Sequence, residues 1–137
     1  MADPFMKDKG MAFHRWLRRL LLPTLLLAWA SSSAATPSPE EHAVIQTLIR
    51  RVEQMSTLTF LRNGSAHSAA EAAKHMQAKY AHFKDKIVTA DDFIELCASR
   101  SEMTGKPYLV KLGDAAPVEA NAFLKKELRA VRGLPPP

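Results

Sequence analysis

The sequence is poor in cysteine: Cys97 is the only one among its 137 residues. With one thiol, the chain cannot form an internal disulfide, so its stability has to come from packing and hydrogen bonds. Cys97 lies within an apolar helical pattern, where a cysteine usually serves as a small buried side chain. We therefore predict that Cys97 is a core residue rather than a reactive thiol.

The sequence also lacks a hydrophobic run long enough to cross a membrane. The longest apolar segment, residues 20–30, has about eleven residues, whereas a transmembrane helix needs roughly 20. Basic residues precede this segment and small residues follow it at 31–35, which is the order of a secretory signal peptide. We predict cleavage after Ala35 and no retained membrane anchor, with Met11 or Met6 as alternative translation starts.

The excess of basic charge belongs largely to this predicted signal peptide. The chain has 19 Lys and Arg and 14 Asp and Glu, and residues 1–35 contain five of the former and two of the latter. The net charge is therefore +5 for the whole chain but only +2 for residues 36–137. A domain that binds nucleic acid needs a concentrated basic face, so the composition argues against a nucleic-acid partner. Residues 36–137 have the length of one domain, in which we expect a disordered, proline-rich C-terminal tail.

Hydrophobic periodicity predicts four helices in residues 36–137. The apolar stripes occupy residues 44–55, 69–83, 93–97 and 120–131. Each of the first three stripes follows a Ser or Thr that can cap a helix, with Glu or Asp three positions later. These predicted caps are Ser38, Ser68 and Thr89.

Two short segments have the pattern of β-strands. Thr57–Leu61 alternates polar and apolar residues before Asn63-Gly64, a dipeptide that tolerates positive φ. Tyr108–Leu112 has the same character and is closed by Gly113. Because a lone strand cannot satisfy its backbone groups, the two strands should pair. We predict an α+β fold of four helices and a two-stranded antiparallel sheet, in the order helix, strand, helix, helix, strand, helix.

Several partial chemical motifs fail on their spacing. Gly105-Lys106 lacks the earlier glycine and the following Ser or Thr of a Walker phosphate loop, and no Gly-x-Ser-x-Gly elbow surrounds Ser65. His75 and His82 are seven residues apart, about 10 Å along a helix axis, which is too far to chelate one metal. We expect these histidines to be solvated, and we expect no metal, no cofactor and no catalytic residue.

One group of polar residues remains as a candidate site. If the two strands pair, the turn after the first and the loop before the second can meet, and their cations, hydroxyls and backbone N–H groups would suit a carboxylate or phosphate. The candidate residues are Arg62, Asn63, Ser65, Arg100, Ser101, Thr104 and Lys106. In the alternative interpretation, Arg62 and Arg100 are structural ties that bond loop carbonyls and helix ends.

Four spaced motifs resemble the YfeK-like family of small exported bacterial proteins, a domain of unknown function. The motifs are residues 60–65, 69–75 with Lys79-Tyr80, 89–101 and 104–108. The resemblance extends from about Ile45 to Val131. It implies export to the periplasm and no assigned activity, and it identifies no catalytic residues.

The sequence therefore predicts a periplasmic, non-enzymatic domain that binds an envelope protein or a small anionic molecule. The alternative is an enzyme that uses Arg62, Ser65 and Arg100. An enzyme should present a deep cleft with a perturbed titratable group, whereas a protein-binding domain should expose an apolar patch of several hundred Å².

Overall fold

The structure, a computed structural model, describes residues 36–136; the predicted signal peptide and Pro137 lie outside the described residues. The four predicted helices are present within that range. They are α1 (Pro39–Glu53), α2 (Ala69–Phe83), α3 (Ala90–Phe93) and α4 (Ala120–Val131). A short 3₁₀ turn, η1 (Lys84–Lys86), follows α2, and α3 continues as a π-helical turn, η2 (Ile94–Ala98).

The predicted capping residues begin the first three helices. Ser38 accepts a hydrogen bond from the backbone N–H of Glu41 at 3.1 Å. At α2 the pairing is reciprocal, since Ser68 Oγ accepts from the Glu71 N–H (3.2 Å) and the Glu71 carboxylate accepts from the Ser68 N–H (2.7 Å). Thr89 caps α3 in the same reciprocal way. These bonds satisfy backbone donors that have no partner inside the helix.

The sheet has four antiparallel strands in the order β2-β1-β3-β4, in the part of the chain that the structure covers. β1 (Leu58–Arg62) and β3 (Leu109–Leu112) are the two predicted strands, and they pair as expected. The α+β class is thus confirmed, but the prediction of two strands was incomplete. β2 (Ser65–Ser68) lacks apolar alternation and β4 (Val118–Glu119) has only two residues, so neither gave a periodic signal.

A two-residue turn at Asn63-Gly64 joins β1 to β2. Both residues have positive φ, 50° and 81°, as a tight hairpin turn of this length requires. Arg62 therefore lies directly opposite Ser65, and Phe60 lies opposite His67. β2 then runs into the cap of α2 without a linker, so the hairpin and the helix form one continuous unit.

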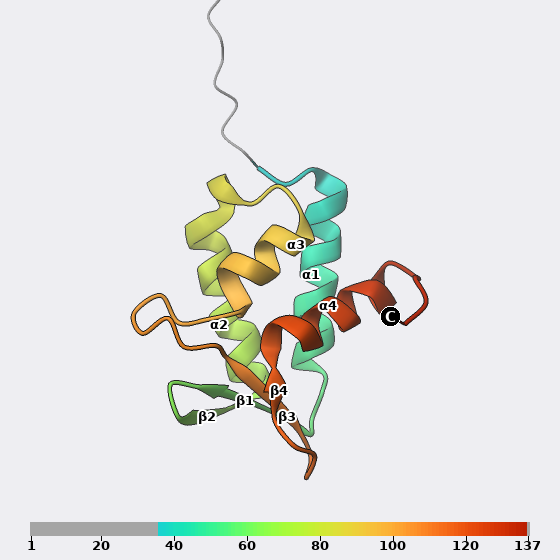
Figure 1. Ribbon diagram of the computed structural model, residues 1–137. Coiled ribbons are helices and arrows are strands. Elements are labelled where there is room, and N and C mark those ends of the chain that lie inside the picture. Colours follow the sequence, from blue (N-terminus) through green and yellow to red (C-terminus); the bar gives the residue numbers. More distant parts are fainter. Residues whose placement is uncertain (1–35, 137) are drawn as a thin grey trace, which may run out of the picture. The chain divides into compact units, whose positions relative to one another are not determined.

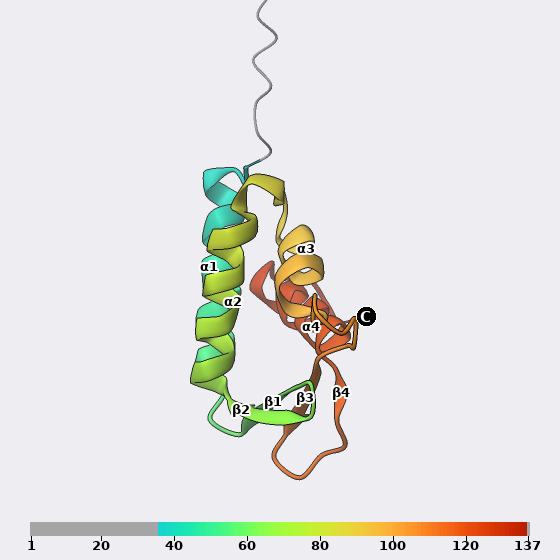
Figure 2. The same cartoon turned by 90° about the vertical axis from the view of Figure 1, so that its left-hand side faces the viewer.

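The core lies between the helices and one face of the sheet. Figures 1 and 2 show α1 and α2 side by side, with the sheet across one end and with α3 and α4 packed beside them. The largest fully buried side chains come from the helices, β1 and β3. They include Ile45, Leu48, Phe60, Met76, Phe93, Ile94, Val110 and Leu124.

Cys97 is one of these core residues, as predicted. It lies in η2 with no exposed surface, and it is the free cysteine of the described region. Burial raises the pKa of its thiol to about 12. The reactive thiolate is therefore scarce at neutral pH, and Cys97 contributes to packing rather than to chemistry.

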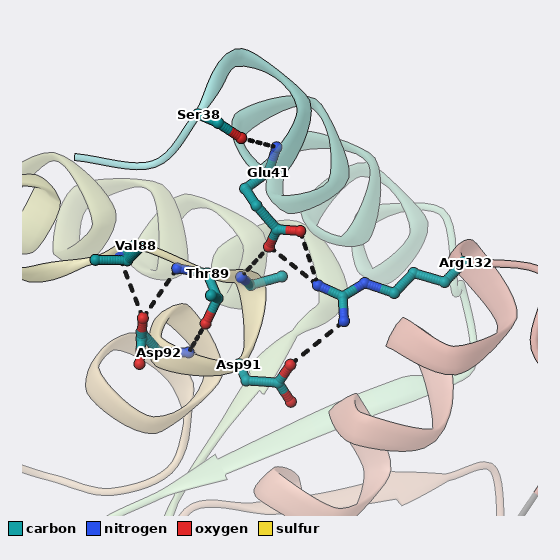
Figure 3. A network of polar contacts seen from close by, with 8 residues as sticks. Ser38, Glu41, Val88, Thr89, Asp91, Asp92 and Arg132 are labelled. Carbon is teal, nitrogen blue, oxygen red and sulfur yellow. Dashed lines mark hydrogen bonds and ion pairs between the residues drawn. The ribbon is translucent and has the colours of Figure 1, made fainter. Parts of the chain in front are cut away.

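Glu41 links the start of α1 to two other helices (Figure 3). One carboxylate oxygen accepts from the backbone N–H of Ala90 in the first turn of α3, at 2.6 Å. Both oxygens lie 3.0 Å from the guanidinium of Arg132, which caps α4 and also reaches Asp91 at 3.5 Å. Three helix ends that are distant in the sequence thus share one carboxylate.

We expect Glu41→Ala to lower the free energy of unfolding by about 2 kcal/mol, because it leaves Ala90 N–H and Arg132 without their charged acceptor. Glu40→Ala is the matched control: Glu40 also lies in the first turn of α1 but is exposed and makes none of these contacts. Its cost should stay near 0.5 kcal/mol, the size of a helix-dipole effect. Urea unfolding of both variants measures the difference, and equal losses would contradict the role of Glu41.

Candidate functional site

The inward face of the sheet changes from apolar to charged along β1. Leu58 and Phe60 are buried at 3% and 1% exposure, and Arg62 follows at the next inward-facing position. Alternation along a strand puts all three side chains on one face, the face toward α2. The guanidinium therefore lies at the end of the hydrophobic core rather than out in solvent.

A half-open hollow of about 340 Å³ lies between this end of the sheet and α2. Strands β1 and β2 supply one wall, and side chains from about two turns of α2 supply the other. Its lining combines apolar, cationic and imidazole groups. The residues are Phe60, Arg62, His67, Glu71, Ala72, Lys74, His75 and Ala78.

Arg62 is held in this hollow by His75. An Nη1 of the guanidinium lies 2.7 Å from His75 Nδ1. Arginine is only a donor, so Nδ1 must be the acceptor, and a neutral His75 must then carry its proton on Nε2. His75 Nε2 lies 3.5 Å from the hydroxyl of Tyr108, whose ring also meets the imidazole edge to face. Tyr108 thus helps to orient the imidazole that holds Arg62.

The environment keeps His75 neutral. Burial, together with the positive charges of Arg62 and Lys79, lowers the pKa of His75 from 6.5 to about 4. At neutral pH the ring therefore accepts from Arg62 without adding charge to the hollow. The prediction that this histidine is solvated was wrong, because helix α2 turns it toward the sheet.

The charged groups of the hollow are Arg62, Lys74 and Glu71. The backbone N–H and hydroxyl of Ser68 hold the pKa of Glu71 below its usual range, so its carboxylate stays ionised. That carboxylate is already committed to the cap of α2. At neutral pH the lining therefore has two cations and one carboxylate, which is already hydrogen-bonded at the helix cap. Its net charge is positive.

His67 contributes an unpaired polar atom to the same wall. Its Nε2 is screened from solvent, and no hydrogen-bond partner for it exists among residues 36–136. A buried polar atom without a partner costs about 1 to 3 kcal/mol. Such an atom calls for an explanation, and a ligand in the adjoining hollow is one.

Lys79 lies deeper, beyond the hollow, and it is 9% exposed. Its ammonium is 5.6 Å from the ring centroid of Phe83, 5.8 Å from that of Tyr108 and 4.0 Å from the carboxylate of Glu102. These rings and this carboxylate offset part of the cost of burying the charge. Lys79 therefore supports the Tyr108 side of the site and does not line the hollow.

The turn and the loop named by the sequence do approach each other, through three of the candidate residues. Asn63 Nδ2 donates to Ser101 Oγ at 3.3 Å, and Thr104 Oγ1 donates to Asn63 Oδ1 at 2.8 Å. The loop is further closed by a backbone bond from Gly105 N–H to the Ser101 carbonyl at 2.8 Å. These polar groups saturate one another, so they act as a tie between the turn and the loop.

The side chains of the remaining candidates do not join that tie, although the backbone N–H of Lys106 donates to Thr104 Oγ1 at 3.3 Å. Ser65 is exposed on β2, and Arg100 and Lys106 are exposed on the loop. Within the part of the chain that the structure covers, no side-chain hydrogen bond or ion pair links Arg100 or Lys106 to Arg62. The seven candidates thus divide into a tie, three exposed residues, and Arg62 in the hollow.

No pattern in the sequence predicted that His67, Lys74 and His75 line one hollow with Arg62. His75 is 13 residues from Arg62 and lies on α2 rather than on the sheet. Whether its side chain reaches Arg62 depends on how α2 is rotated about its axis over the sheet. One local pattern could have indicated such a partner. Arg62 is a charged residue at the third inward-facing position of a strand, and it needs a polar partner on the element that packs against that face.

A second hollow of about 300 Å³ lies beside α4, lined by Asp91, Lys125, Leu128, Arg129, Arg132 and Leu134. Its cations already have partners. Lys125 bonds Glu95 at 2.7 Å, Arg132 bonds Glu41, and Arg129 donates twice to the carbonyl of Pro135. This hollow therefore has less to offer an anion than the one at Arg62.

No cluster of three or more His, Cys, Asp or Glu side chains is arranged to bind a metal ion within residues 36–136. No helix there has both the length and the apolar character needed to cross a membrane.

The low pKa of His75 makes stability depend on pH. Between pH 6.5 and 4, His75 is protonated in the unfolded chain but not in the folded chain. Its contribution to the free energy of unfolding is therefore complete above pH 6.5 and is lost as the pH falls toward 4. We expect a loss of about 1 to 2 kcal/mol over this window, after allowing for solvent screening of a partly exposed group. His75→Gln should remove this part of the pH dependence, as measured by urea unfolding at pH 7 and pH 4.5.

His82→Gln is the control, since His82 lies on the same helix but is exposed. It should retain the pH dependence of the unaltered protein. Parallel pH profiles for the unaltered protein and His75→Gln would contradict the placement of His75 against Arg62.

Comparison with known proteins gives matches of unknown function. The profile of a family of unknown function, DUF5329, matches residues 39–132. Over 83 residues the chain is 41% identical to the uncharacterized protein YfeK of Salmonella typhimurium strain LT2. That alignment covers 61% of this chain and 65% of the relative, so the chain spans less than two thirds of the relative's length. No solved structure is significantly similar. The predicted resemblance to the YfeK-like family is confirmed.

Proposed function

We propose that this chain, which belongs to the family of unknown function DUF5329, is an exported binding domain whose hollow at Arg62 takes an anionic ligand. The observation that carries the proposal is the position of Arg62. Its guanidinium lines a half-open hollow and is held there by a neutral imidazole at 2.7 Å. Arginine is held in place without being neutralised.

The geometry of Arg62 favours an oxyanion. A guanidinium has five N–H donors in a planar fork, and one of its nitrogens bonds His75. The remaining donors suit the two oxygens of a carboxylate or phosphate. Lys74, on the opposite wall, adds a second positive charge. Partial burial strengthens such interactions, because the effective dielectric is lower than that of water.

Binding, rather than catalysis, is what the titratable groups of the hollow support. A general base works best with a pKa near the operating pH, and that of His75 is about 4 with Nδ1 occupied by Arg62. Glu71 is committed to the helix cap. Ser65, the nucleophile of the enzyme alternative, is exposed on β2 and has no base bonded to it among the described residues.

An apolar protein-binding patch has less support. Five large apolar side chains are exposed in residues 36–136. Leu112 and Val118 lie on the neighbouring strands β3 and β4, and the other three, Val88, Met103 and Leu134, come from three different segments. Single exposed apolar residues are normal on a soluble domain and do not mark an interface.

Arg62→Gln should weaken the binding of acetate or inorganic phosphate to the hollow by about 10- to 100-fold, the range for losing a charge-assisted hydrogen bond. Titration followed by backbone amide NMR shifts of β2 and α2 measures the change. Circular dichroism establishes that the variant is folded.

Arg100→Gln is the matched control, because Arg100 is exposed and lies outside the hollow. It removes the same charge from the protein, so it should leave the affinity within about twofold, a shift attributable to screened long-range charge. If both variants weaken binding equally, general charge attraction explains the effect and the proposed site is wrong.

We also propose that the chain is exported to the periplasm through a signal peptide, residues 1–35, that is cleaved after Ala35. Two observations support this proposal. The order of basic, apolar and small residues in 1–35 is that of a signal peptide, and the family match begins at residue 39, soon after the proposed cleavage point.

Fractionation of a bacterium that expresses the full chain, followed by intact-mass measurement, tests export. We expect the protein in the periplasmic fraction, with Thr36 as its first residue. Recovery of the uncleaved chain from the cytoplasm would contradict the proposal.

A further inference from the structure

We infer that the ligand of the Arg62 hollow is a carboxylate that carries an apolar body, rather than a bare inorganic anion. This inference rests on the proposed function and adds the chemical class of the ligand. Its support comes from the charge balance, the apolar wall and the size of the hollow.

The charge balance favours a single negative charge. Arg62 of β1 and Lys74 of α2 line the hollow together with one carboxylate, that of Glu71 in α2. Because the cap keeps Glu71 ionised, the lining has a net charge of about one positive unit at neutral pH. A carboxylate matches that charge, whereas the second negative charge of phosphate would exceed the net positive charge of the lining.

The walls of the hollow are apolar away from the charged groups. Phe60 presents its ring from β1, and Ala72 and Ala78 present methyl groups from α2. Phe60 and Ala72 are 1% exposed and form the closed inner part of this wall, whereas Ala78 is exposed and is the apolar group that a ligand can still cover. A ligand gains about fourfold in affinity for each of its own methylenes that it buries against the wall.

The size of the hollow also exceeds that of a simple anion. A volume of about 340 Å³ corresponds to roughly eleven water molecules at about 30 Å³ each. Acetate and phosphate would each leave most of that water in place. A ligand with an alkyl chain or an aliphatic side chain displaces more of the water beside Ala78 while its carboxylate stays on Arg62.

Two sources could supply this chemistry: a free alkyl carboxylate, and the C-terminal residue of a peptide. They differ in the amide that precedes the carboxylate of a peptide. His67 bears on this difference, because it lines the β2 wall and its Nε2 has no hydrogen-bond partner among residues 36–136. A peptide amide offers that atom both a donor and an acceptor, which a free alkyl carboxylate lacks. The experiment therefore contains one probe of each kind.

Competition between five probes tests the inference on the intact protein: acetate, inorganic phosphate, hexanoate, hexanamide and N-acetylleucine. We expect hexanoate and N-acetylleucine each to bind at least tenfold more tightly than acetate, because each buries additional apolar carbon. Hexanamide, which has the chain without the charge, should bind at least tenfold more weakly than hexanoate. The tighter of the two favoured probes identifies the source.

Ala78→Leu supplies the matched variant. Ala78 lines the hollow but is exposed on α2, so a leucine there suits the helix and fills the apolar end without disturbing the core. Ala78→Leu should abolish the tighter binding of hexanoate relative to acetate. It should leave the affinity for acetate within twofold of that of the unaltered protein. Gln77→Leu, an exposed position outside the hollow, should change neither.

The outcomes separate this inference from the proposed function. If acetate and phosphate bind through Arg62 but hexanoate and N-acetylleucine bind no more tightly, the ligand class is wrong and the anion site stands. If phosphate binds more tightly than every carboxylate, the charge argument is overturned. If no probe binds, the proposed function fails together with the inference.

Discussion

The pairing of β1 with β2 on one side and β3 on the other is the constraint on which both the sheet and the site depend. It sets Leu58, Phe60 and Arg62 in a row beneath α2. A strand cannot bury its first two inward residues without also directing the third toward the same layer, because the side-chain period is two. The charge of Arg62 is therefore brought to the edge of the core by the same pairing that builds the core.

A guanidinium in that position needs partners that do not cancel it. A carboxylate beside Arg62 would make an ion pair and close the site. The structure instead places His75 there, kept neutral by burial and by nearby cations, so that Arg62 is oriented while its charge remains available. The pKa of His75 and the positive character of the hollow are thus two results of one arrangement.

Much of the fold followed from local signals in the sequence. The capping pairs beginning at Ser68 and Thr89 are contiguous motifs with a direct physical meaning, and the structure contains both. The β1–β3 pairing followed from the need of backbone groups for partners. The edge strands β2 and β4 were missed because their short, polar sequences acquire strand character only through the neighbouring strand.

The site was less predictable, and the reason is geometric. Contact between Asn63 and Ser101 was foreseeable, because pairing two strands brings their adjoining loops together. Contact between Arg62 and His75 depends on the rotation of α2 about its axis, and no residue near either one encodes that rotation locally. The hollow combines one predicted site residue, Arg62, with three polar residues that were not predicted to join it, His67, Lys74 and His75.

A crystal structure of the protein grown with hexanoate tests the central claim most directly. The account predicts a carboxylate within hydrogen-bond distance of the Arg62 guanidinium, the Arg62 to His75 bond intact, and the alkyl chain against Phe60 and Ala78. A guanidinium turned away from His75 into solvent, or a carboxylate bound elsewhere while the hollow contains only water, would contradict it.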